Sequence, residues 1–273
     1  MLNSPSTSRR LLTALRLAGA AALLTATAAL GACNVSITNQ AEGRAEWKRD
    51  YTLTADGSLE IRATNGQIDI EPSEGDKVTV VAERIAKAAT DDAAKKAAEE
   101  MEIKETVSSS SILLDGRTNS SGIMIGGSRQ IKFHIRAPKG ARLTLTTTNG
   151  KLVIRDMTGE LRLDTTNGEI EGRNLAGTTR AETTNGVISL DYAALGSGGV
   201  TAETTNGTVD ISLPKTLKAR ISARVVNGDI NTEDLTLETS EKSRRRLSGT
   251  LNGGGPEIRV ETTNGAVSFR GRQ

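Results

Sequence analysis

The tetrapeptide TTNG occupies residues 147–150 and returns at residues 165–168, 183–186, 204–207 and 262–265. In every copy an aliphatic residue stands two positions after the glycine. A tight turn requires only the Asn-Gly pair, because these two residues adopt the backbone conformations that turns need. The repeated threonines and aliphatic residues therefore need a further cause.

Asn-Gly pairs recur along much of the chain. Their asparagines are Asn65, Asn149, Asn167, Asn185, Asn206, Asn227, Asn252 and Asn264. The first four steps from Asn149 are nearly equal, and a fixed period of about 20 residues is typical of repeat architectures. Around all but Asn252, mostly apolar residues and threonines alternate with polar ones, which predicts a short, half-buried strand on each side of the turn. We expect Asn252 to lie in a loop.

Asn-Gly between alternating strands is typical of antiparallel hairpins, but opposed residues in a hairpin need only be compatible. In a parallel solenoid each residue stacks on its equivalent about 4.8 Å away, so identical residues are favoured. Aliphatic side chains then form the core, inward threonine methyls pack, and inward asparagine amides bond along the stack. We predict an all-β fold, a single elongated β-solenoid with rungs of about 18–21 residues. An antiparallel meander is the alternative.

The N-terminal segment is predicted to be a lipoprotein signal peptide. Residues 8–33 read SRRLLTALRLAGAAALLTATAALGAC, a basic start, a short apolar run and small residues before the chain's one cysteine. Leu30-Gly31-Ala32-Cys33 resembles the bacterial lipobox, which implies cleavage before Cys33 and lipid attachment to it. An ordinary secretory signal is the alternative. In Gram-negative lipoproteins Asp after the cysteine resembles an inner-membrane retention signal, so Asn34 favours the outer membrane.

The predicted organisation has three parts. Residues 1–32 are the signal peptide, residues 33–46 a lipid-anchored tether, and residues 47–273 the solenoid domain. Within the domain, an alanine-rich segment at about 91–101 predicts one short inserted helix with Thr90 as its N-cap. Residues at about 233–256 are expected to form an irregular loop.

The lipobox, the TTNG rungs and the stretch FHIRAPKGARLTLTTTNGKLVI at residues 133–154 point to a known family. The domain resembles the bacterial "putative-adhesin" family of β-strand-repeat domains, also described as domains of unknown function. The resemblance covers about residues 47–273 and implies a cell-envelope location. It brings no catalytic residues with it.

Charged residues at the outward positions are the candidates for interaction. Asp164, Glu182 and Glu203 stand three positions before consecutive corner asparagines, where stacked like charges repel unless they are neutralised. Arg162 and Arg180 are the expected partners. A calcium-binding ridge and a carbohydrate-cleaving cleft are the alternatives. A second candidate is the run Arg244, Arg245 and Arg246, which could contact phosphate headgroups or anionic glycans, or form a solvated loop.

The sequence favours binding over catalysis. The chain has one histidine, His134, expected to face outward, and it lacks serine-nucleophile and phosphate-loop motifs, so we predict no enzyme activity, no metal and no cofactor. Without the three arginines of the signal peptide the charge balance is 32 basic to 33 acidic residues, which gives no indication of nucleic-acid binding. We predict a lipid-anchored binding or scaffolding protein of the envelope, with an unknown protein or glycan partner. A sensor subunit that docks a signalling partner and a polysaccharide-active enzyme are the alternatives.

Overall fold

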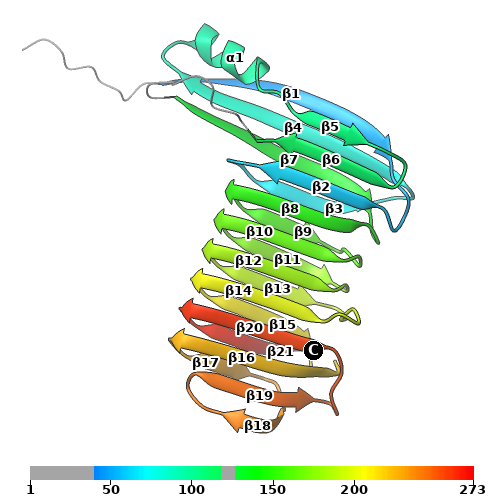
Figure 1. The fold of residues 1–273 in the computed structure, drawn as a ribbon, viewed down its shortest axis with the longest axis vertical. Coiled ribbons are helices and arrows are strands. Elements are labelled where there is room, and N and C mark those ends of the chain that lie inside the picture. Colours follow the sequence, from blue (N-terminus) through cyan, green and yellow to red (C-terminus); the bar gives the residue numbers. More distant parts are fainter. Residues whose placement is uncertain (1–39, 118–126) are drawn as a thin grey trace, which may run out of the picture. The chain divides into compact units, whose positions relative to one another are not determined.

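The computed structural model describes residues 40–117 and 127–273, and these residues build two long β-sheets joined at their corners (Figure 1). The predicted signal peptide, Cys33 and residues 34–39 of the predicted tether lie outside the described residues. In the part of the chain that is described, no helix is long and apolar enough to cross a membrane.

The two sheets contain ten and eleven of the described strands. In spatial order, sheet A consists of β1 (Ala41–Thr52), β4 (Lys77–Ala88), β7 (Ser128–Pro138), β3 (Ile68–Ser73), β9 (Leu152–Arg155), β11 (Ile170–Leu175), β13 (Ile188–Tyr192), β15 (Val209–Pro214), β21 (Val267–Arg272) and β17 (Ile230–Glu233). Sheet B consists of β18 (Glu238–Lys242), β19 (Arg246–Leu251), β16 (Ala219–Asn227), β20 (Glu257–Asn264), β14 (Val200–Asn206), β12 (Thr179–Asn185), β10 (Leu161–Asn167), β8 (Arg142–Asn149), β2 (Ser58–Ala63), β6 (Ser111–Gly116) and β5 (Lys104–Val107).

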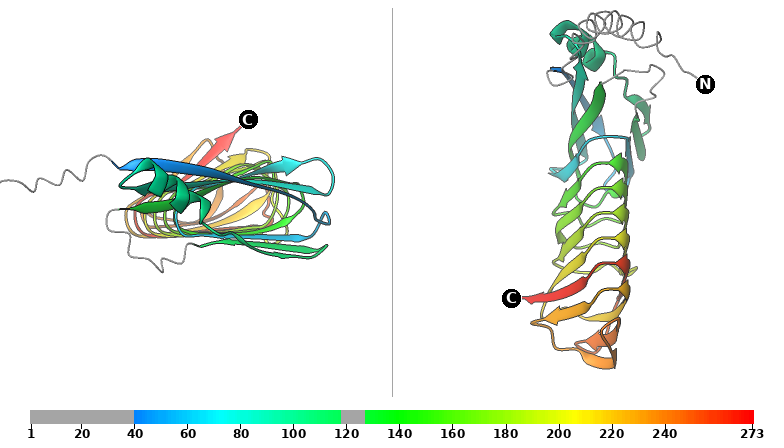
Figure 2. Two further views of the ribbon diagram at one scale, coloured as in Figure 1. Left: turned by 90° about the horizontal axis from the view of Figure 1, so that it is seen from above. Right: turned by 90° about the vertical axis from the view of Figure 1, so that its left-hand side faces the viewer.

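Each rung consists of one strand of sheet B, an Asn-Gly corner and one strand of sheet A (Figure 2). Neighbouring rungs pair in parallel with every corner in register, so that Asn167 lies between Asn149 and Asn185. The side chains that alternate inward from both sheets form one continuous apolar core. The prediction of an all-β solenoid is thereby confirmed, and the antiparallel alternative is wrong for the rungs.

The structure explains most of the repeated tetrapeptide. The first threonine points inward, and in four rungs its hydroxyl donates to the glycine carbonyl of the neighbouring corner at 3.2–3.4 Å. The glycine is required because neighbouring corners approach closely: a Cβ atom on Gly168 would lie 1.9 Å from the Gly150 carbonyl oxygen. The second threonine is exposed, and we find no contact with another described residue that requires it.

The corner asparagines form a ladder along the edge of the stack. Each amide after the first donates to the side-chain oxygen of the asparagine before it at 2.8–2.9 Å, in the spatial order Asn65, Asn149, Asn167, Asn185, Asn206, Asn264 and Asn227. All of these bonds therefore run in one direction along the stack. The expectation that these amides point inward was wrong, because all but the half-buried Asn65 are exposed at the corner.

The C-terminal rung does not stack in chain order. Strands β20 and β21 lie between the rung of β14 and β15 and the rung of β16 and β17. The predicted irregular loop at about 233–256 was also wrong in part, because it contains β18 and β19, which continue sheet B in antiparallel pairing beyond β16. Leu247 and Leu251 of β19 alternate inward and cover this end of the core.

The other end of the stack is antiparallel and carries the helix. Strand β1 pairs with β4 over its whole length from Ala41, so the predicted tether boundary at residue 46 lies too far along the chain. Repeat alignment could not detect β1, because its partner is not an equivalent rung. Helix α1 (Asp91–Glu99) is capped by Thr90, whose side chain accepts from the Ala93 amide, and its alanines pack against β1 and β4.

Candidate functional site

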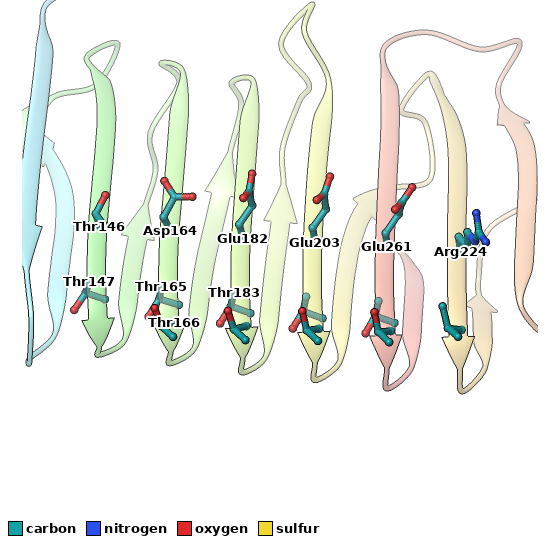
Figure 3. Close-up of a pocket in the computed structure, with 16 residues that line it drawn as sticks. Thr146, Thr147, Asp164, Thr165, Thr166, Glu182, Thr183, Glu203, Arg224 and Glu261 are labelled. Carbon is teal, nitrogen blue, oxygen red and sulfur yellow. The ribbon is translucent and has the colours of Figure 1, made fainter.

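An open groove runs over the outer face of sheet B, across β8, β10, β12, β14, β20 and β16 (Figure 3). Its volume is about 530 Å³. One wall is a row of outward side chains three positions before each corner asparagine. In spatial order these are Thr146, Asp164, Glu182, Glu203, Glu261 and Arg224. The other wall is the exposed threonine row, which ends at Val226.

The structure brings the three predicted acidic residues together and adds a fourth. Asp164, Glu182 and Glu203 lie in register on adjacent parallel strands, so neighbouring members are one strand spacing, about 4.8 Å, apart. Glu261 follows Glu203 because β20 is inserted beside β14. Sequence reasoning missed Glu261, although the shared tetrapeptide ETTN at residues 203–206 and 261–264 was a usable signal. We call these four residues the acidic row.

Arginines of the same strands pair with three members of the acidic row. Arg162 contacts Asp164 at 3.1 Å, Arg259 contacts Glu261 at 2.6 Å, and Arg180 is ion-paired with Glu182. Glu203 differs, because Thr201 occupies the position of the arginine, and Glu203 forms no ion pair with the described residues. Arginines therefore neutralise three of the four carboxylates of the acidic row.

Asp164 shows how partial burial and a neighbouring like charge act on a carboxylate. Partial burial raises the pKa of Asp164 above its ordinary value, and the neighbouring Glu182 charge raises it further. Arg162 and, more weakly, Arg180 oppose this rise. The net effect is that the fold disfavours the charged form of Asp164.

The predicted arginine run lies at the end of the groove. Arg244 is ion-paired with Asp229 and lowers the pKa of that carboxyl group. Arg245 and Arg246 are exposed and form no ion pair with the described residues. Arg246 lies opposite Arg224 in the antiparallel pairing of β16 with β19, so the acidic row passes directly into a pair of opposed arginines.

The other candidate groups stay apart from this groove. His134 is exposed on β7, beside Asp69 of β3 and Val81 of β4. Among the described residues no group of three or more His, Cys, Asp or Glu side chains could hold a metal ion. The four carboxylates of the acidic row stand in line along a sheet and do not converge on one point, an arrangement that suits contact with an extended surface.

This geometry of in-register corners can be compared with known proteins. The family model described as Toastrack DUF4097 matches residues 118–270, more than half of the chain. The chain belongs to the Toastrack DUF4097 family. The match includes the acidic row, the arginine run and most of the inserted C-terminal rung of this Toastrack chain.

Solved structures with some similarity to this Toastrack chain come from bacteria. One is a "putative cell adhesion protein" from Clostridium sporogenes, with 13% identity, TM-score 0.46, 84% of this chain covered and 100% of the other. A "putative adhesin" from Bacteroides fragilis has 14% identity, TM-score 0.39 and coverages of 84% and 97%. A "putative lipid binding protein" from Parabacteroides distasonis has 9% identity, TM-score 0.29 and coverages of 82% and 96%. No curated protein matches the chain.

Proposed function

We propose that this Toastrack chain is a non-enzymatic, lipid-anchored binding or scaffolding protein of the bacterial cell envelope. The anchor is Cys33, which follows the lipobox-like Leu30-Gly31-Ala32. Gln40, where the described domain begins, lies seven residues after it, so the domain would stay close to the membrane surface. With Asn34 after the cysteine, the outer membrane is the proposed location.

The observation that carries the binding role is the groove on sheet B. Its two walls repeat the same residue types on adjacent strands, with carboxylates on one side and threonine hydroxyls on the other. Such a surface offers hydrogen-bond groups at a constant spacing of about 4.8 Å. It therefore fits an extended envelope partner, protein or glycan, that makes similar contacts along its length.

Glu203 is the best position at which to test this proposal. It lies in the middle of the groove, it is half-buried, and no described residue neutralises it. Asp210 provides a matched control, because it lies on the same rung, is equally half-buried, forms no described ion pair and points outward from sheet A. Glu203→Lys and Asp210→Lys change the net charge by the same amount on opposite faces of one rung.

The experiment is affinity capture from detergent-solubilised envelopes with the anchored protein and both variants. We expect a specific partner to be captured by the parent and by Asp210→Lys, and to be lost with Glu203→Lys. Equal capture by both variants would contradict a role for the groove. Circular dichroism spectra of the three proteins should coincide, so that loss of binding is not loss of fold.

A further inference from the structure

The C-terminal rung, residues 257–272, lies at a position in the stack that the spacing of the preceding rungs does not predict. It lies between two rungs that are consecutive in the chain and pairs in parallel with both. Its inward residues Ile258, Val260, Val267 and Phe269 are fully buried. In Figure 1 the strands of this rung, coloured red, lie between yellow and orange strands.

The two flanking rungs have the spacing of direct neighbours. Asn206 and Asn227 are as far apart in the chain as Asn185 and Asn206, which stack directly on each other. In the structure, however, Asn264 stands between Asn206 and Asn227, donating to the former and accepting from the latter. Residues 200–233 form the two flanking rungs, and we call the space between them the slot. The slot is thus a site for a rung whose corner is in register with theirs.

A glycine-rich linker joins β19 to the rung. Residues 252–256 read NGGGP, and Asn252, Gly253 and Gly254 all have positive φ angles of 51°, 80° and 84°. The Asn252 amide bonds to the carbonyls of Lys215 and Leu217 at 2.8 Å, which holds the linker against the connection from β15 to β16.

We propose that the slot also accepts the C-terminal rung of a second copy of this chain, giving a dimer in which the two copies exchange residues 257–272. Every contact that the rung makes within one chain is available unchanged between two, since the slot and the rung are identical in each copy. The corner ladder sets the same register in both cases, because a shift by one residue would turn the buried face outward. The linker is the segment that must change direction.

The first measurement is size-exclusion chromatography with light scattering on the full chain carrying Cys33→Ser, in detergent, after warming to the unfolding midpoint and cooling. We expect a dimer whose fraction rises about tenfold for a tenfold higher concentration in the dilute range, by mass action. Deletion of Gly253 and Gly254 should raise the dimer fraction further, because a shortened hinge disfavours return of the rung to its own slot. Absence of a dimer at every concentration would overturn the proposal.

The second measurement identifies what the dimer exchanges. Thr205 and Thr263 are exposed and lie between two registered pairs, Thr204 with Thr262 and Asn206 with Asn264. One chain carries Thr205→Cys, the other Thr263→Cys, and both lack Cys33; they are mixed, warmed, cooled and oxidised. A covalent heterodimer is expected. Its yield must exceed that of a control mixture in which Thr148→Cys on β8 replaces Thr205→Cys, and an equal yield would overturn the exchange.

Discussion

The amide ladder at the corners makes a quantitative prediction about stability. Asn185 takes part in two ladder bonds, donating to Asn167 at 2.9 Å and accepting from Asn206 at 2.8 Å. Asn227, at the end of the ladder, takes part in one, donating to Asn264 at 2.8 Å. None of these asparagines has a positive φ, so replacement by alanine removes the amide without a backbone penalty. Asn185→Ala should therefore cost about twice as much as Asn227→Ala.

The magnitude follows from the exposure of the corner. A net hydrogen bond contributes about 0.5–1.5 kcal/mol, and water at an exposed corner favours the lower end of this range. Asn185→Ala should lower the free energy of unfolding by about 1 kcal/mol and the melting temperature by roughly 2–4 °C for a domain of this size. Asn227→Ala should cost about half of that. Calorimetry and urea unfolding measure both, with the exposed Thr184→Ala as a control expected to stay within about 0.5 kcal/mol. Equal effects of the two asparagine substitutions would refute the ladder as a source of stability.

Three further predictions concern the anchor, the core and the acidic row. Cys33→Ala should prevent processing and membrane retention, and a normal mature mass with normal retention, measured by mass spectrometry and fractionation, would rule out the lipobox. Ile188→Asp, at a fully buried position, should cost about 3–5 kcal/mol of unfolding free energy. Glu169→Ala removes a carboxylate that contacts Lys151 at the surface and should cost less than about 0.5 kcal/mol. Similar melting curves for the two variants would contradict the assignment of inward and outward faces. Millimolar calcium should leave the melting temperature unchanged, because arginines neutralise three of the four carboxylates, and a rise that Glu182→Gln abolishes would oppose this.

The parallel rungs could be predicted because the sequence repeats the same residues at the same corners. In a parallel stack equivalent residues are direct neighbours, so recurrence in the sequence becomes contact in the structure. The same argument placed Ile188 in the core. The cap of α1 at Thr90 followed from local chemistry alone, since a side-chain oxygen before an alanine-rich segment satisfies a free amide at the helix start.

The order of the rungs could not be derived from the steps between corners. The step from Asn206 to Asn227 permits these two rungs to stack directly on each other, and the spacing does not predict another rung between them. The residue types before the corners, in contrast, do indicate the order of the rungs. β14 and β20 share ETTN before the corner, whereas β16 has RVVN, so the rule that identical residues stack favours β20 as the neighbour of β14. The antiparallel strands at the ends have no repeated partner, and the alignment of corners could therefore not predict them.

In a stacked repeat protein, residues that recur because the fold requires them must be distinguished from residues that serve a function. The inward threonine, the asparagine and the glycine of the corner are required by hydrogen bonds and close approach between rungs, so their repetition reports the fold. Stacking does not require the outward residues to change from rung to rung.

Three departures from the outward pattern lie beside the inserted C-terminal rung. Thr201 replaces the arginine that would neutralise Glu203, Arg224 replaces a carboxylate, and Val226 replaces a threonine. These positions lie on the rungs that flank the inserted C-terminal rung. Without β20, the unneutralised Glu203 would face Arg224 directly in the register that the spacing of the corners allows. Insertion of β20 places Glu261 between them, so the rung that completes the fold also determines the order of charges along the groove.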